Sequence, residues 1–312
     1  MNIQFLKPLS NGFNRMKAAL FKPFDLKKWF VVGFTAFLAG LGDGSSGGGG
    51  NAGGNGNDMD FGVVLDAPYS AWSWLQDHPT YYSLAIMGII FVVGLIVVLL
   101  WLSSRGKFMF LYNVVTDRAE IAKPWRQYTR LGNSLFLWRL AFVIVVLTLF
   151  VTFFINVWQH THQLYFNQSE TVPFTYLVQM GFLFLLLLLA VAYIDMLLSA
   201  FVVPIMYKHN KTATNAWGTF LSIHWSHFSS FLLFGVLRLV LFLGIGAMLL
   251  VFGLFTCCLG FILLALPYIN SVVTLPISFT LRAFSLDFLA QFGDEFNVFL
   301  KGLETDYPEA VG

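Results

Sequence analysis

Asp195 is the residue of this sequence whose type and setting most suggest chemistry. It is the one charged side chain in the apolar run 174–206, and a carboxylate inside a membrane usually faces the protein interior and finds a partner. It lies thirteen residues before Lys208, about 20 Å along a helix. Arg238, on the next apolar run, lies eleven residues beyond His227, about 16 Å by the same rise. These similar depths predict an ion pair between Asp195 and Arg238.

The predicted Asp195–Arg238 pair allows two interpretations. It acts as a proton relay, a gate or a solute contact, or it is a structural pair that sets the register of two helices. The structural interpretation is favoured, because pairing is the least costly way to keep either charge in a membrane. A third alternative is that Asp195 is protonated and hydrogen-bonded. Arg139 lies only a few residues inside its own run, so its side chain can extend to the interface instead.

The last apolar run, 259–281, is interrupted by polar and helix-breaking residues. Pro267, Asn270 and Pro276 all fall within it. Proline frees a backbone carbonyl in a membrane helix, and Asn270 can satisfy that group. Broken helices line the substrate sites of some transporters, although they also occur as plain kinks. Both interpretations of this run stay open.

The histidines do not form a known metal or catalytic motif. His224 and His227 share one helical face in H-W-S-H, and His160 and His162 lie in a predicted loop. Neither pair matches H-E-x-x-H. The glycine-rich segment 40–57 lacks the flanking strand and the lysine of a phosphate-binding loop. We therefore expect no metal, no cofactor and no catalytic set. Nucleic-acid binding has no support either, because membrane topology already explains the basic residues.

The elements that must position these residues are membrane helices. Of the 312 residues, 57% are hydrophobic and 11% charged, whereas a soluble domain carries roughly a quarter charged residues. An apolar run of about 20 residues crosses a bilayer. The sequence predicts an all-α integral membrane protein with about six transmembrane helices and amphipathic cytoplasmic connecting helices. The six runs are 29–41, 83–103, 135–157, 174–206, 229–254 and 259–281. The first run is short, so it either crosses the membrane completely or enters and leaves it on the same side.

The distribution of basic residues predicts the topology. No Lys or Arg occurs in 42–82 or 158–173, whereas 105–130 holds six. Cytoplasmic loops are enriched in Lys and Arg, so six alternating spans put both termini in the cytoplasm and the protein in the cell (inner) membrane. Trp125 and Trp217 are expected at the cytoplasmic interface, where tryptophan is enriched.

The chain divides into three predicted regions. Residues 1–28 form a basic, amphipathic cytoplasmic segment, 29–281 the helical bundle with a flexible outer loop at 40–57, and 282–312 a cytoplasmic tail. The N-terminal segment either lies on an anionic membrane surface or packs on the protein's own helices. One helical face of it carries four apolar residues, Phe13, Met16, Leu20 and Phe21.

Several segments resemble an uncharacterised prokaryotic multipass membrane family. They are P-F-D-L-K-K-W-F, the glycine-rich segment after it, R-G-K-F-M-F, P-W-R-Q-Y and N-S-L-F-L-W-R. That family is similar to the membrane domain found on some glycerophosphoryl diester phosphodiesterases. The resemblance covers most of the chain and implies a multi-spanning fold without an established activity. The phosphodiesterase's soluble catalytic barrel has no counterpart in this sequence, so its enzymatic activity is not implied.

These observations together predict a non-enzymatic function. We expect a protein that organises membrane or lipid, or a subunit of a membrane assembly, because the long Phe- and Leu-rich faces favour lipid or helix contact over an aqueous path. The expected partners are membrane lipids, another copy of the chain or another membrane protein. The alternative is a transporter or channel that uses Asp195, Arg238 and the interrupted last run.

Overall fold

The computed structural model describes most of the chain. Within the described residues every regular element is a helix, and one isolated bridge joins Phe21 and Phe24. The prediction of an all-helical protein is therefore confirmed. Most of the predicted loop 40–57 and the end of the predicted tail 282–312 lie outside the described residues. The described residues are 3–41, 61–165, 173–256, 260 and 264–299.

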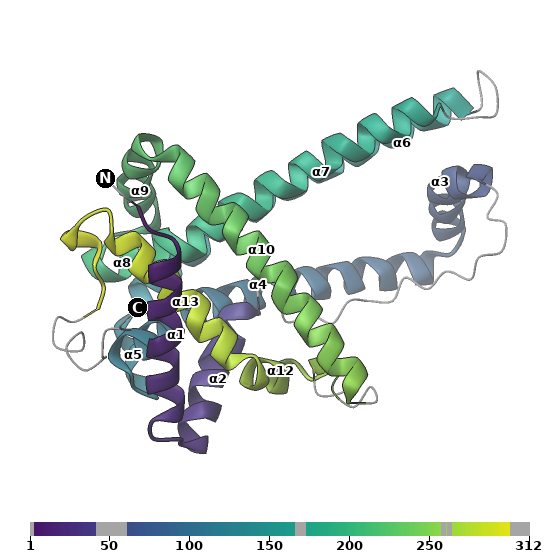
Figure 1. Cartoon of the computed structure of the whole chain (residues 1–312). Coiled ribbons are helices and arrows are strands. Elements are labelled where there is room, and N and C mark those ends of the chain that lie inside the picture. Colours follow the sequence, from purple (N-terminus) through teal and green to yellow (C-terminus); the bar gives the residue numbers. More distant parts are fainter. Residues whose placement is uncertain (1–2, 42–60, 166–172, 257–259, 261–263, 300–312) are drawn as a thin grey trace. The chain divides into compact units, whose positions relative to one another are not determined.

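Figure 1 shows the helices coloured along the chain. In chain order they are α1 (Leu6–Phe21), α2 (Leu26–Gly40), α3 (Phe61–Asp77), α4 (Pro79–Thr116), α5 (Ala122–Gln127), α6 (Thr129–Leu164), α7 (Phe174–Leu197), the π-helix η2 (Leu198–Val202), α8 (Val203–His209), α9 (Ala213–Ser226), α10 (Phe228–Phe255), α12 (Pro267–Val273), α13 (Leu275–Ala290) and the 3-10 turn η3 (Asp294–Phe296).

Four helical stretches are long and apolar enough to cross a bilayer. They are α4, α6, the continuous stretch from α7 through α8, and α10. A fifth is obtained if α12 and α13, which meet at 64°, count as one broken span. The first predicted run forms α2, whose 15 residues extend about 22 Å. Several membrane-spanning candidates are thus present among the described residues, and the count of six stays a prediction.

The chain forms two compact units. Unit 1 comprises Met1–Gly48, Leu99–Trp138 and Tyr193–Gly312, and unit 2 comprises Gly49–Val98 and Arg139–Ala192. The helices α4, α6 and α7 each contribute residues to both units. We describe each unit by itself.

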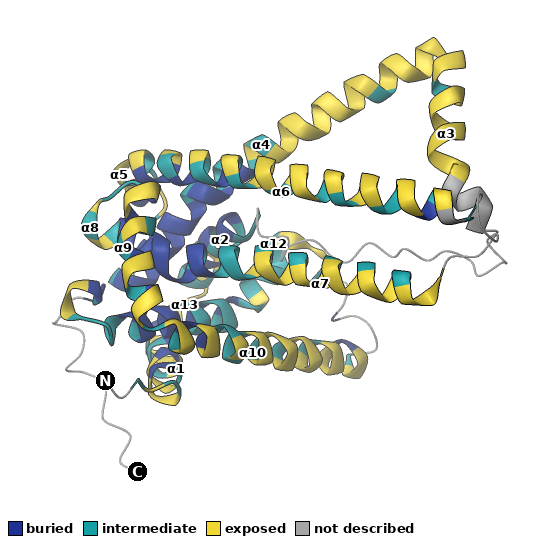
Figure 2. Ribbon diagram, turned by 90° about the horizontal axis from the view of Figure 1, so that it is seen from above, coloured by how far each residue is buried: buried dark blue, intermediate teal, exposed yellow. Residues whose placement is uncertain are grey.

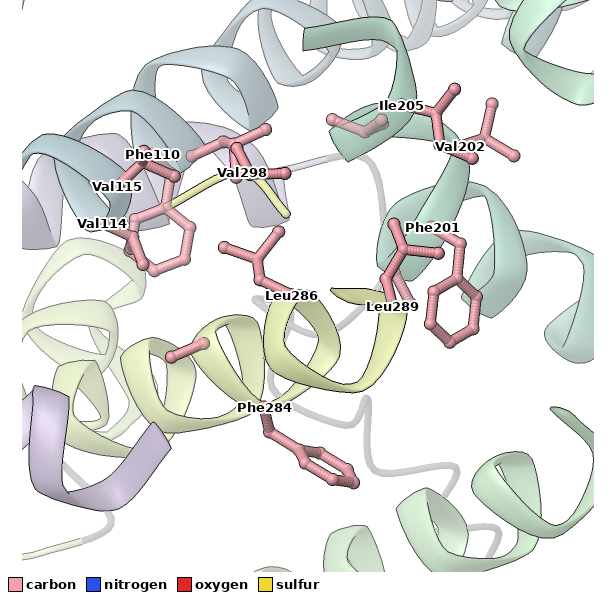
Figure 3. Packing of buried hydrophobic residues seen from close by; sticks show 14 of the residues in the cluster. Phe110, Val114, Val115, Phe201, Val202, Ile205, Phe284, Leu286, Leu289 and Val298 are labelled. Carbon is pink, nitrogen blue, oxygen red and sulfur yellow. The ribbon is translucent and has the colours of Figure 1, made fainter. Parts of the chain in front are cut away.

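Phenylalanine is the commonest residue type in the core of unit 1. The ring centroid of Phe201 in η2 lies 4.9 Å from that of Phe234 in α10 and 5.5 Å from that of Phe220 in α9. Phe284 and Phe288 are four residues apart on α13, which puts both rings on the side that the core covers. Figure 3 shows Leu286 and Leu289 of the same helix beside residues of η2 and α8. Aromatic pairs of this kind add about 0.5–1.5 kcal/mol beyond the area they bury.

Glycines allow the helices of unit 1 to approach closely. A Cβ atom on Gly12 of α1 would lie 2.9 Å from backbone atoms of α13, and one on Gly106 of α4 would lie 2.5 Å from the backbone of Leu38 in α2. A Cβ atom on Gly33 of α2 would lie 2.7 Å from the Cγ2 methyl of Val272 in α12. Small residues at such crossings let backbones pack against each other. They hold α1 on α13, and α2 between α4 and α12.

Unit 2 leaves most of its apolar side chains exposed, and Figure 2 shows this along α3 and α7. At most 6% of the residues are buried in the apolar windows of α4, α6 and the stretch from α7 through α8, all of which contribute to this unit. Its helices contact one another through pairs of aromatic rings. The ring centroids of Tyr69 and Trp158 are 4.8 Å apart, and those of Phe150 and Phe184 are 5.8 Å apart. His162 Nε2 lies 3.5 Å from Oδ1 of Asp66, a contact that is an ion pair when the histidine is protonated.

Candidate functional site

Lys107 is the most deeply buried basic residue that the structure describes. The sequence places it in a basic segment expected in the cytoplasm, but α4 continues to Thr116 and carries Lys107 into the core of unit 1, where it is 2% exposed. Its Nζ donates a hydrogen bond to Ser199 Oγ at 2.6 Å. A buried ammonium group is stable only when hydrogen bonds or charges replace water, so this contact is a specific feature of the fold.

Ser199 brings two cations together. Its hydroxyl accepts the hydrogen bond from Lys107, and its backbone carbonyl accepts one from Nη1 of Arg282 on α13. Ser199 belongs to the π-helix η2. Single π-turns within α-helices are rare and are often found at functional sites. We call Lys107, Ser199 and Arg282 the Ser199 cluster.

Arg238 reaches the same helix as Arg282. Its Nη1 donates to Ser285 Oγ at 3.4 Å, and Ser285 follows Arg282 by three residues on α13. Residues three apart share one face of a helix. The structure therefore brings two arginines from different elements to one face of α13, in which Ser285 is buried.

Asp195 is half-buried at the end of α7, one turn before Ser199. The Arg238 side chain contacts Ser285 of α13, and its predicted pairing with Asp195 stays a prediction. Arg139, the third predicted intramembrane charge, is buried on α6.

The predicted helix break lies at the junction of α12 and α13. Pro267 and Pro276 each stand in the first turn of a helix, where the missing N–H costs no helical hydrogen bond. The backbone carbonyl of Asn270 accepts from the N–H of Thr274 at 2.8 Å and from its hydroxyl at 2.7 Å. Thr274 thus places both its N–H and its hydroxyl on one carbonyl at the end of α12, and the role predicted for the Asn270 side chain stays a prediction.

The two predicted interfacial tryptophans pack in unit 1. Trp125 lies 5.8 Å from Trp101, ring to ring, and the guanidinium of Arg105 stands over both, 4.8 Å and 4.4 Å from their centroids. Trp217 stacks on Trp138 at 5.2 Å. Both contacts are of kinds that stabilise a fold, through cation–π attraction and aromatic stacking.

The buried histidine His224 is surrounded by aromatic rings. Its ring lies 5.3 Å from that of Phe231 and 5.5 Å from that of Phe220. Burial lowers the pKa of the imidazole, because a charged ring would lose its hydration. His227 packs against Phe292 at 5.2 Å. In the described part of the chain no three His, Cys, Asp or Glu side chains are grouped to hold a metal.

The Ser199 cluster can bind or orient a charged group, since it concentrates cationic donors at one helical turn. Ser199 Oγ and Lys107 Nζ, 2.6 Å apart, are also the residue types of serine–lysine catalytic pairs. Sequence reasoning missed Lys107 because it counted every basic residue between two apolar runs as loop. The signal was available, because the apolar pattern resumes at once after Lys107, from Phe108 to Val115.

Comparison with known proteins places most of the chain in one family. A family model described as "Family of unknown function (DUF7544)" matches residues 4–271. No curated protein and no solved structure matches the chain.

Proposed function

Because the chain belongs to DUF7544, a family of unknown function, we propose its function from its own residues. We propose a non-enzymatic integral membrane protein that organises membrane lipid or serves as a subunit of a membrane assembly. Its partners are membrane lipids, further copies of the chain or another membrane protein. The likeness to the membrane domain of glycerophosphoryl diester phosphodiesterases stays a prediction.

The exposed apolar faces of the long helices carry this proposal. Their apolar windows are at most 6% buried, so the chain itself covers little of their surface. Such surfaces need lipid or another protein around them. A carrier with an aqueous path would need polar side chains along these helices, whereas Val, Leu, Ile and Phe fill them.

We propose the cell inner membrane as the location, with both termini in the cytoplasm and six spans. The support is the absence of Lys and Arg from residues 42–82 and 158–173, which fits loops on the outer side. In this arrangement α2 and the bent pair α12–α13 supply the first and last spans. Either could instead re-enter on the side from which it starts.

The alternative function is transport, through a transporter or channel that uses Asp195, Arg238 and the broken last span. Two observations favour it: the 64° bend between α12 and α13, and the buried Lys107 and half-buried Arg282 that contact Ser199. Broken helices and buried charges accompany ion and substrate paths in membrane proteins.

Native mass spectrometry on protein extracted gently with its lipids tests the preferred function. A defined homo-oligomer, a retained membrane partner or a set of co-purifying lipids is expected. A monomer that releases one specific small solute would contradict the proposal and favour transport.

The variant Asp195→Asn separates the two functions further. Transport predicts that flux into proteoliposomes is lost while the thermal stability in detergent is retained. A structural role for Asp195 predicts reduced thermal stability with no solute flux in either protein. The double variant Asp195→Leu with Arg238→Leu is the control, because a structural ion pair predicts that removing both charges restores stability lost in Asp195→Asn.

A further inference from the structure

The turn between α1 and α2 exposes an apolar tip. Phe21, Phe24 and Leu26 are 48%, 59% and 59% exposed, although each is a residue type that is normally buried. We call residues 21–27 the α1–α2 elbow. Single exposed apolar residues are ordinary, but three within six positions of one turn form a patch that calls for an occupant.

The elbow is held in shape by contacts from beneath. The indole Nε1 of Trp29 donates to the backbone carbonyl of Leu20 at 2.9 Å, and its ring lies 5.5 Å from Phe21 and 5.7 Å from Phe24. Asp25 caps α2 by accepting from the N–H of Lys27 at 2.8 Å. The two phenylalanines are therefore presented by a defined turn, so little conformational entropy is lost when something binds them.

Positive charge surrounds the tip. Lys17, Lys22 and Lys27 are all exposed, and Lys17 lies with its Nζ 4.5 Å from the ring centroid of Phe13. The one acid of residues 1–28 is Asp25, which already serves as the helix cap. Lys28 is excluded from this set, because it pairs with Asp117 at 2.9 Å.

The opposite face of α1 is not available to a membrane. Met16 and Leu20 are buried, and α1 packs through Gly12 onto α13. The four residues that the sequence places on one helical face, toward either a membrane surface or the protein's own helices, are divided. Phe13 and Phe21 are exposed, whereas Met16 and Leu20 belong to the core of unit 1. The exposed apolar surface lies at the end of α1, in the elbow.

We propose that the α1–α2 elbow inserts into the surface of an anionic phospholipid bilayer. Phe21, Phe24 and Leu26 enter the boundary between headgroups and acyl chains, and Lys17, Lys22 and Lys27 lie against lipid phosphates. This combination of apolar and basic residues is the one that interfacial segments use. The inference rests on the membrane location in the proposed function, and adds an anionic lipid as the ligand.

Charge complementarity favours lipid over a second copy of the chain. If the elbows of two copies met symmetrically, the three lysines of each would come together, six in all, around their exposed phenylalanines. Like charges in contact oppose association. An anionic lipid surface satisfies the same lysines without that cost.

The test uses the full chain in nanodiscs of phosphatidylcholine with or without phosphatidylglycerol. A fluorescent NBD label is attached at Leu26→Cys, with the two natural cysteines, Cys257 and Cys258, changed to serine. We expect quenching by lipids that carry a spin label near the headgroup, and stronger quenching when phosphatidylglycerol is present. Replacing Lys17, Lys22 and Lys27 by Gln should remove the dependence on phosphatidylglycerol. Each lysine is expected to change the inserted-to-free ratio of the elbow by about fivefold.

The matched control removes three positive charges elsewhere, with Arg126, Arg130 and Lys208, all exposed, changed to Gln. This variant should retain the dependence on phosphatidylglycerol at the elbow. Equal quenching with and without phosphatidylglycerol in the parent protein, or equal loss in both triple variants, overturns the proposal. So does efficient disulfide cross-linking between copies at position 26, which would make a second copy the occupant. Any of these failures leaves the proposed function intact, because that is judged by the species seen in native mass spectrometry.

Discussion

Unit 1 encloses a core of apolar side chains, whereas the described part of unit 2 does not, although α10 of unit 1 is itself largely exposed. In unit 1, Phe201, Phe220 and Phe234 are fully enclosed, and glycines hold the backbones in contact. In unit 2, the apolar side chains of α4 and α7 are mostly exposed. Apolar composition alone therefore does not decide what a helix packs against. Unit 1 is stabilised by its own core, whereas unit 2 depends on what surrounds it.

The helix α4 has an exposed half and a buried half. Phe91 in its first half is 71% exposed, whereas Phe108 in its second half is 0% exposed. Gly88 has open space where a Cβ atom would stand, whereas Gly106 faces the backbone of Leu38 and Ala39. Substitutions of the same type in the two halves therefore provide matched tests of the comparison.

The largest expected effect is that of removing a ring from the core of unit 1. Phe201→Ala should lower the free energy of unfolding by about 3–5 kcal/mol, because it leaves a cavity among rings that cannot close fully. Phe91→Ala should change it by less than about 0.5 kcal/mol in detergent, because the ring is 71% exposed and loses little contact with protein. Unfolding by SDS in mixed micelles, followed by circular dichroism, measures both. Equal losses would show that unit 2 is also held by its own packing.

The next effect is that of adding a methyl group to a glycine of α4. Gly106→Ala should destabilise the protein by about 1–3 kcal/mol, since the new Cβ meets the backbone of α2 and a helix must shift. Gly88→Ala is the control and should be neutral or slightly stabilising, because alanine favours the helix. The same SDS titration tests this pair. A neutral Gly106→Ala would contradict the close contact of α2 and α4.

A smaller effect is expected from the pH dependence of His224, whose pKa is lowered by burial. Below the ordinary histidine pKa of about 6.5, the unfolded chain takes up a proton that the folded chain resists. Stability is therefore complete above about pH 6.5 and decreases as the pH falls toward the lowered pKa. Melting temperatures of the parent and of His224→Phe between neutral and mildly acidic pH should differ in slope. Identical slopes would contradict the burial of a neutral ring.

The smallest effect should be that of the ion pair in unit 2. Asp66 and His162 are 3.5 Å apart with side chains 55% and 32% exposed, and exposed pairs contribute about 0–1 kcal/mol. Asp66→Asn should change the unfolding free energy by less than about 1 kcal/mol. Arg118→Gln, which removes another exposed pair, with Glu120, is the matched control. A much larger loss for Asp66→Asn would show that unit 2 has a specific core of its own.

Part of the fold could be predicted because it depends on local pattern. Apolar runs of sufficient length require helices in a membrane, since backbone groups there must bond within their own segment. Pro267 and Pro276 similarly predicted a break in the last run, and the helices there meet at 64°. These features follow from the chemistry of neighbouring residues.

The contacts of the candidate site could not be predicted in the same way. Whether Arg238 meets Asp195 or Ser285 depends on how α10 and α13 are rotated, and depth along a helix carries no information about rotation. The stripe of Phe13, Met16, Leu20 and Phe21 was visible in the sequence, but which two of these residues are buried depends on where Gly12 lets α13 approach.

The sequence by itself determined that the protein is helical and suited to a membrane, because length and hydrophobicity of a run are sufficient to decide how it meets lipid. Only the tertiary structure decided which charges are buried and together. Lys107 becomes a core residue because α4 continues without interruption and the π-turn at Ser199 offers an oxygen at the right place. The contact between Lys107 and Ser199 depends on how helices far apart in the chain are rotated and bent, and a local sequence pattern does not predict this.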